Sequence, residues 1–204
     1  MKKIYLLRHG EAEANVLGLV NGTPAHALTE KGRQQAVRAG RLIKEYGLRF
    51  DALMVSHWAR ARQTAEIVLP GATFETDPRL GEHDSGECGN LTWAEAEKMY
   101  PDFFRIRSFS TPYPGGESVS QLHARVLDWF MEADTALAKD ASLLAVTHAG
   151  PIDRLLRHVC HVPAELNKAV FFAANASLTC IAKEPGNRWS GDPGGWELKF
   201  FSLL

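Results

Sequence analysis

Ile4-Tyr5-Leu6-Leu7-Arg8-His9-Gly10-Glu11 is a short apolar run that ends in a cation, an imidazole, a glycine and a carboxylate. The run predicts a buried strand whose carboxyl end carries Arg8 and His9, and open α/β sheets bind their ligands at this end. Arg8 offers a fixed fork of donors for phosphate or carboxylate, and His9 can change its charge near neutral pH. The stretch therefore indicates anion chemistry, although a surface arginine beside a turn histidine explains these few residues equally well.

Two later strands are expected to end in a similar way. Ser142 to Thr147 is a continuous apolar run that leads into His148-Ala149-Gly150, and Asp51 to Ser56 is followed closely by Arg60. If the three strands lie side by side in a parallel sheet, their carboxyl ends bring the arginines and histidines into one crevice.

The rest of the chain alternates helices with strands, which predicts an α/β fold. Capping residues mark the start of three helices, because Thr29, Thr92 and Ser118 each precede a helical pattern. Residues 11–27 and 77–91 are expected to be loops, and 185–195 a turn region. The predicted helices cover residues 29–46, 58–69, 92–100, 118–139 and 152–159, and the further strands cover 72–76, 177–183 and 196–202.

The composition limits the classes of partner. The length of 204 residues suits a single domain, residues 1–204, with residues 92–117 as a cap-like excursion. The 23 Lys and Arg residues nearly balance the 24 Asp and Glu residues, so we expect a small-molecule partner and no nucleic acid. No apolar stretch approaches the length of a membrane span, and the three cysteines form no Cys-x-x-Cys pair, which predicts a cytoplasmic protein without membrane contact.

Four ordered blocks of residues stand out along the chain: Arg8-His9-Gly10-Glu11, Ser56-x-x-x-Arg60-Ala61-x-Gln63-Thr64-Ala65, Leu80-x-Glu82-x-x-x-Gly86 and Thr147-His148-Ala149-Gly150. In this order they resemble the histidine phosphatase superfamily, which includes the phosphoglycerate mutase-like enzymes, and Gly115-Gly116-Glu117-Ser118 matches a further family segment. The resemblance runs from Ile4 to about Leu156, and it implies a phosphoglycerate mutase-like α/β fold: a three-layer α/β/α sandwich with a mostly parallel central sheet.

The resemblance also implies roles for individual residues. His9 corresponds to the nucleophile that becomes phosphorylated, and Glu82 corresponds to the proton donor. Arg8, Arg60 and His148 correspond to the groups that grip the transferred phosphoryl group. The expected catalytic residues are therefore His9, Glu82, His148, Arg8 and Arg60, and the expected substrate-binding residues are Arg8, the loop residue Asn15, Arg60, His148 and Ala149.

Phosphoryl transfer needs side chains of these types. Its transition state spreads negative charge over the equatorial oxygens, so two arginines and a protonated His148 are expected to stabilise it without a metal or cofactor. His9 must attack as a neutral imidazole, with its other nitrogen donating to a backbone carbonyl. Glu82 must give a proton to the departing alkoxide and then activate water.

The leading prediction is a metal-independent phosphomonoester hydrolase that acts on small phosphorylated metabolites through phospho-His9. Mutases of the family carry an Arg-His-Tyr-Gly run and a longer insertion after the acid, whereas His83-Asp84-Ser85-Gly86 follows Glu82 here, which favours hydrolysis. A phosphoglycerate mutase-type phosphotransferase and a non-catalytic phospholigand-binding module remain as alternatives. A homodimer is a further possibility, because the late strands could expose a sheet edge.

Two other kinds of site use some of the same residue types. Two histidines and a carboxylate can hold a metal, but Arg8 and Arg60 would repel a cation beside His9. Cys88 could act as a thiol nucleophile, but position 94 is alanine, so the Cys-x5-Arg cradle of cysteine phosphatases is absent. Both kinds of site are therefore disfavoured.

Overall fold

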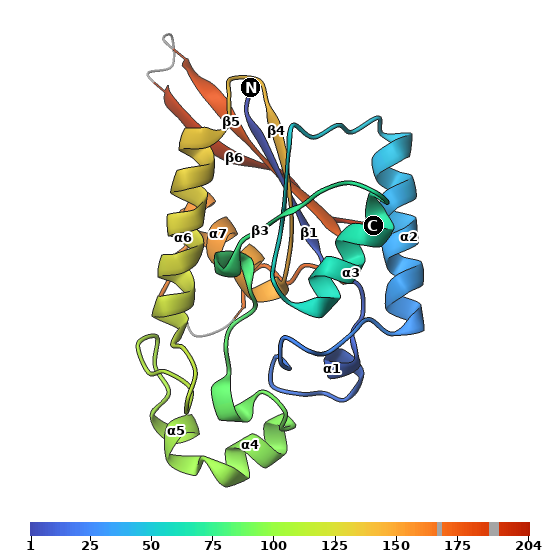
Figure 1. Ribbon diagram of the computed structural model, residues 1–204. Coiled ribbons are helices and arrows are strands. Elements are labelled where there is room, and N and C mark those ends of the chain that lie inside the picture. The colour runs from blue at the N-terminus through green and yellow to red at the C-terminus, as the bar shows by residue number, and fades with distance from the viewer. Residues whose placement is uncertain (167–168, 188–191) are drawn as a thin grey trace.

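The computed structural model describes residues 1–166, 169–187 and 192–204 (Figure 1). Within these ranges one six-stranded sheet has the strand order β3-β2-β4-β1-β5-β6. The first four strands in this order run parallel to one another, and β5 and β6 pair antiparallel. The strands are β1 (Lys3–Arg8), β2 (Ala52–Val55), β3 (Glu75–Thr76), β4 (Ser142–Thr147), β5 (Leu178–Asn187) and β6 (Asp192–Leu203).

Helices cover both faces of the sheet, with α2 and α3 on one face and α6 and α7 on the other (Figure 1). Alternate side chains of a strand point to opposite faces, so Tyr5 and Leu7 pack with α2 and α3, while Ile4 and Leu6 pack with α6 and α7. The predicted α/β/α sandwich with a mostly parallel sheet is thus confirmed. The helices are α1 (Glu13–Val16), α2 (Glu30–Glu45), α3 (Ala59–Val68), α4 (Trp93–Met99), α5 (Pro101–Ile106), α6 (Val119–Ala136) and α7 (Ala149–Val159).

The register of the central strands places three strand ends at one level. In β1 and β4, Arg8 lies beside Thr147, and in β2 and β4, Val55 lies beside Val146. The backbone N–H of His9 donates to the carbonyl of Thr147 at 3.0 Å, which extends this pairing by one residue. The residues that follow β1, β2 and β4 therefore meet at the same edge of the sheet.

The predicted helix caps are present, whereas several short elements differ from the prediction. Thr29, Thr92 and Ser118 each accept a hydrogen bond from the first turn of their helix. The short helices α1 and α5 were not predicted, and β3 spans two residues where five were expected. Strands β5 and β6 extend into the predicted turn region 185–195, of which residues 188–191 lie outside the described residues.

Residues 92–117 form α4, α5 and a loop around a small apolar cluster. This cluster contains Val20, Cys88, Ala96 and Tyr113, so the segment packs on the loop that follows β1. An isolated bridge between Leu19 and Thr92 joins the same two segments. None of the helices in the described part of the chain has the length and apolar character needed to cross a membrane.

Candidate active site

His9 follows β1 and is almost completely buried, with an exposed fraction of 1%. Its Nδ1 donates to the carbonyl of Gly10 at 2.6 Å, and its Nε2 accepts from Nε of Arg60 at 3.1 Å. A carbonyl can only accept, so the proton is on Nδ1 and the lone pair is on Nε2. Burial, followed by the charges of Arg60 and Arg8, holds the pKa of His9 well below its usual value. His9 is therefore neutral, with Nε2 available as a nucleophile.

Arg60 projects from the first turn of α3 towards His9. Its two terminal nitrogens donate to the carbonyls of Thr23 and Asn21 at 3.1 and 2.9 Å, and its guanidinium lies 4.3 Å from the centroid of the Trp58 ring. Burial lowers the pKa of Arg60 to about 10, which leaves the group charged at neutral pH. The loop after β1 thus fixes the cation beside His9.

Arg8 supplies the second cation at the end of β1. Its Nη1 donates to the carbonyl of Ala173 at 2.5 Å, and its guanidinium lies 5.2 Å from the centroid of the Phe172 ring. Among the described residues, its buried Nε has no hydrogen-bond partner. A buried donor without an acceptor is costly, so Arg8 suits an anionic ligand.

His148 lies next to His9, with 5.0 Å between the two ring centroids. Its Nε2 is 2.8 Å from Oγ of Ser56, the residue that follows β2, and its buried Nδ1 has no partner within the described residues. Burial and the charge of Arg60 hold the pKa of His148 well below its usual value. Desolvation opposes a third cation beside Arg8 and Arg60, so a protonated His148 is disfavoured before a phosphoryl group binds, and its protonation in the transition state stays a prediction. When Ser56 donates to Nε2, the proton on Nδ1 can still be donated to a phosphoryl oxygen.

Glu82 lies in the acid loop, which we define as residues 79–86. Its Oε1 accepts from the backbone N–H groups of His83 and Gly150 at 2.9 and 3.1 Å, and the carboxylate is buried. Gly150 is in the first turn of α7, and a Cβ there would lie 2.2 Å from Oε1 of Glu82. The acid loop and the residues after β4 thus position the carboxylate together.

The two remaining predicted residues lie at the border of this cluster. Asn15 is exposed, and its Oδ1 accepts from the N–H of Ala12 at 2.9 Å and from Nδ2 of Asn175 at 3.5 Å. The same nitrogen of Asn175 donates to the carbonyl of His9 at 3.1 Å. Ala149 begins α7 beside Glu82. A phosphate contact of Asn15 and Ala149 stays a prediction, and Asn175 was not predicted because no local motif marks it.

A pocket of about 350 Å³ opens beside Glu82 and the start of α7. Trp93 and Arg107 from the 92–117 segment form part of its wall, so this segment reaches the predicted acid. The pocket is lined by Asn21, Glu82, His83, Trp93, Arg107, Val119, Leu122, Ala149, Gly150, Asp153, Arg154, Leu166, Ala169, Phe171 and Phe172.

The other chemistries considered from the sequence gain no support from the structure. Cys88 is a buried free thiol, and burial raises its pKa, which disfavours the nucleophilic thiolate. In the described part of the chain, no group of three or more His, Cys, Asp or Glu side chains is arranged to hold a metal ion.

Comparison with known proteins assigns the chain to a family. A family model described as histidine phosphatase superfamily (branch 1) matches residues 4–191. The chain belongs to the histidine phosphatase superfamily. Within this superfamily, it is 32% identical over 160 residues to rat (Rattus norvegicus) 6-phosphofructo-2-kinase/fructose-2,6-bisphosphatase 1, covering 77% of this chain and 32% of that protein. The chain thus spans about a third of the length of this relative.

Other histidine phosphatase relatives match along nearly their whole length. A 2,3-bisphosphoglycerate-dependent phosphoglycerate mutase from Brucella ovis is 29% identical over 200 residues, covering 90% of this chain and 97% of the mutase. The structure of a mycobacterial glucosyl-3-phosphoglycerate phosphatase with VO3 is 26% identical, covers 100% of both chains and has a TM-score of 0.81. The superfamily neighbours therefore include both phosphatases and mutases.

Proposed function

We propose that this protein is a metal-independent phosphomonoester hydrolase that acts on small phosphorylated metabolites through a phosphohistidine at His9. The observation that carries the proposal is the pairing of Nε2 of His9 with Nε of Arg60 at 3.1 Å, within one buried cluster that also contains Arg8 and His148. A neutral nucleophile surrounded by fixed donors suits an anionic phosphoryl group. Glucosyl-3-phosphoglycerate phosphatase, a relative, is named for this class of reaction.

The first step transfers the phosphoryl group to His9. The lone pair of Nε2 attacks phosphorus, the N–P bond forms, and the ester P–O bond breaks. The departing alkoxide takes a proton from the carboxylic acid of Glu82. Arg8 and Arg60 balance the charge on the equatorial oxygens, and His148 donates a hydrogen bond to one of them.

The second step hydrolyses the phosphohistidine. The carboxylate of Glu82 takes a proton from water as the water oxygen attacks phosphorus, and the N–P bond breaks. His9 returns to its neutral form and inorganic phosphate leaves. One carboxyl group thus acts as acid and then as base, so its position must suit both steps.

The pocket beside Glu82 supports a small substrate. Its volume of about 350 Å³ lies within the range for sites that bind small molecules. Its mixed lining includes the rings of Trp93 and Phe172 together with the guanidinium of Arg107. We therefore expect residues 92–117 to help select the alcohol portion of the substrate.

The proposal is tested by measuring phosphate release from 4-nitrophenyl phosphate and from a panel of phosphorylated metabolites. Activity is expected to persist in excess EDTA, because the two arginines supply the positive charge. The His9→Ala variant should be inactive and should carry no acid-labile phosphate after incubation with labelled substrate. Undiminished activity of His9→Ala would exclude the proposed mechanism.

A phosphoglycerate mutase-type phosphotransferase is the second candidate, supported by the match to the Brucella ovis mutase along 97% of its length. Incubation with 3-phosphoglycerate separates the two, because a mutase isomerises it and a phosphatase releases phosphate. A phospholigand-binding module without turnover would bind phosphate esters and release no phosphate from any of them. The short acid loop after Glu82 favours hydrolysis over transfer.

A further inference from the structure

We propose that Arg125 and Glu117 form a clamp that positions the carboxyl group of Glu82 for both of its proton transfers. The inference rests on the proposed function, because it assigns these two residues to the acid and base steps. The clamp joins α6 to the acid loop, and neither residue belongs to the expected catalytic or substrate-binding set.

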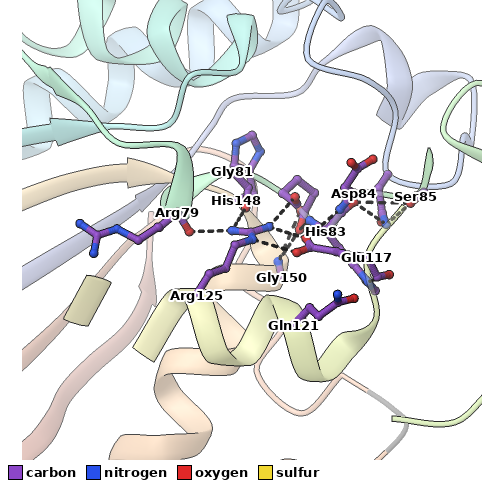
Figure 2. Close-up of polar contacts among 12 residues, drawn as sticks. Arg79, Gly81, His83, Asp84, Ser85, Glu117, Gln121, Arg125, His148 and Gly150 are labelled. Atoms are coloured by element: carbon purple, nitrogen blue, oxygen red, sulfur yellow. Dashed lines mark hydrogen bonds and ion pairs between the residues drawn. The ribbon is translucent and has the colours of Figure 1, made fainter. Parts of the chain in front are cut away.

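Arg125 grips the backbone of the acid loop (Figure 2). Its Nη1 donates to the carbonyls of Arg79 and Gly81 at 2.6 and 2.9 Å, and its Nη2 donates to the carbonyl of Glu82 at 2.9 Å. Its Nε and Nη2 donate to the two carboxylate oxygens of Glu117 at 3.0 and 2.5 Å. These contacts use all five N–H donors of the guanidinium. Three of the five hydrogen bonds go to backbone carbonyls in the segment that ends at Glu82.

Glu117 holds the next part of the same loop. Its Oε1 accepts from the N–H of Asp84 at 3.0 Å, and its backbone N–H donates to the carbonyl of Asp84 at 2.9 Å. Its own carbonyl is 3.0 Å from Nε2 of His83 and accepts a hydrogen bond from it. Arg125 therefore holds the backbone up to and including Glu82, and Glu117 holds the two residues that follow it.

The acid loop needs this clamp because residues 81–85 belong to neither a helix nor a strand. The N–H of His83, one of two donors to the Glu82 carboxylate, comes from this irregular backbone. A shift of the loop would therefore move both the carboxylate and its donor relative to Gly150. A displacement of about 1 Å can lower the reaction rate on the order of 100-fold.

The pairing also controls charge near the acid. The positive charge of Arg125 reaches the site, where it contributes to lowering the pKa of His148 and that of His57. Both partners of the clamp are partly buried, with exposed side-chain fractions of 22% for Arg125 and 15% for Glu117. The carboxylate of Glu117 therefore balances the positive charge of Arg125 beside the acid loop.

The decisive experiment compares substrates with different leaving groups in the Arg125→Lys variant. Lysine keeps the charge and loses the planar fork. 4-Nitrophenolate leaves without a proton, whereas the alkoxide of an alkyl phosphate such as glycerol 2-phosphate needs Glu82. We expect kcat/KM for the alkyl phosphate to fall about tenfold or more, because general acid catalysis contributes about 10²–10⁴-fold to the rate and a misplaced acid loses part of this. We expect kcat/KM for 4-nitrophenyl phosphate to stay within about twofold of the wild-type value.

A second readout follows the base step. Both substrates form the same phosphohistidine, so slower activation of water should lower kcat for 4-nitrophenyl phosphate and produce a burst of 4-nitrophenol equal to the enzyme concentration. Glu117→Gln should change both readouts in the same direction, and it serves as the test if Arg125→Lys does not fold. Arg33→Lys, at an exposed position of α2, is the matched control and should behave as the wild type.

The outcomes separate the two proposals. If Arg125→Lys lowers kcat/KM equally for the alkyl phosphate and 4-nitrophenyl phosphate, or lowers it for neither, the clamp is overturned while the proposed phosphatase activity stands. A wild-type protein that releases no phosphate, or a His9→Ala variant with full activity, would instead overturn the proposed function and the clamp with it.

Discussion

His9 and His148 are both buried, and the distance between their ring centroids is 5.0 Å, yet their hydrogen bonds prepare them for different tasks. The carbonyl of Gly10 fixes the proton of His9 on Nδ1 and leaves Nε2 as a nucleophile. The hydroxyl of Ser56 contacts Nε2 of His148, so Nδ1 of this ring remains for a ligand. The hydrogen-bond partners of each ring, rather than the residue type, distinguish the proposed nucleophile from the proposed donor.

A Gly150→Ala substitution tests the position of Glu82 at the residue scale. A Cβ at this position would lie 2.2 Å from Oε1 of Glu82 and would displace the carboxylate. Position 150 lies in α7, where alanine favours the helix over glycine by roughly 0.5–1 kcal/mol. We expect kcat/KM for alkyl phosphates to fall at least about tenfold while the unfolding temperature is unchanged or higher.

Gly195→Ala is the control for this substitution, because a Cβ at Gly195 would meet no atom within 4 Å. Activity should be retained in the control. Wild-type activity of Gly150→Ala towards alkyl phosphates would show that the observed place of the carboxylate does not matter for turnover.

The positions of the site residues and the neutral form of His9 could be predicted from the sequence, but the lowered pKa of His148 could not. Arg8, His9, Arg60 and His148 follow recognisable motifs at predicted strand ends, so their convergence was expected. The charge state of His148 depends on desolvation by residues distant in the sequence, which no local motif reveals. Asn175 and the Arg125–Glu117 clamp went unpredicted because they act through long-range backbone contacts.

At the scale of elements, the N-terminus of α2 packs against the chain that leaves β1. A Cβ on Gly10 would lie 2.3 Å from the carbonyl oxygen of Gly32, and a Cβ on Gly32 would lie 1.9 Å from that of Glu11. These distances involve backbone atoms that no side-chain rotation can relieve. Two glycines therefore permit the helix to approach the segment that carries His9.

A Gly32→Ala substitution should separate these two elements. Insertion of a methyl group into a tightly packed contact costs about 1–3 kcal/mol of unfolding free energy, so urea denaturation should show a loss of this size. Because the shift falls next to His9, activity should fall as well. Arg33→Ala, at the exposed neighbouring position, is the control, and equal stability of the two variants would contradict the packing seen here.

Elements with local signals were predicted better than those without them. Thr29, Thr92 and Ser118 cap their helices as expected, because a cap depends on residues within one turn. The four-residue α1 and six-residue α5 are too short to show a helical period. The long β5–β6 pairing crosses Pro185, which lies opposite Gly194, and such residues usually indicate a turn.

At the scale of the whole molecule, the ends of β1, β2 and β4 bring two arginines and two histidines into one buried cluster at the edge of the sheet. Arg8 and Arg60 are 7% and 2% exposed, and the two site histidines are nearly inaccessible. Desolvation raises the free energy of each charged group, so the histidines lose their protons first while the arginines stay charged. The site therefore holds its positive charge at the cost of keeping its imidazoles neutral.

The lowered pKa values of the buried histidines predict how the stability of the protein depends on pH. Burial lowers the pKa of five histidines in the folded protein: His9, His57, His83, His123 and His148. The unfolded chain takes up their protons below about pH 6.5 while the folded chain does not, so the stabilising effect is complete above this pH and is lost as the pH falls. His9 and His148 each contribute at most about 1.4 kcal/mol per pH unit below it.

Urea denaturation at pH 7.5, 6.5 and 5.5 measures this dependence, and the free energy of unfolding should decrease less in the upper interval than in the lower one. A His57→Gln/His123→Gln variant, which leaves the proposed catalytic residues intact, should show a smaller decrease. The carboxylates of Asp77, Asp134 and Asp153 have lowered pKa values and contribute with the same sign only at more acidic pH. A protein that becomes more stable between pH 6.5 and 5.5 would therefore be carrying charged imidazoles in its interior, contrary to the burial found here.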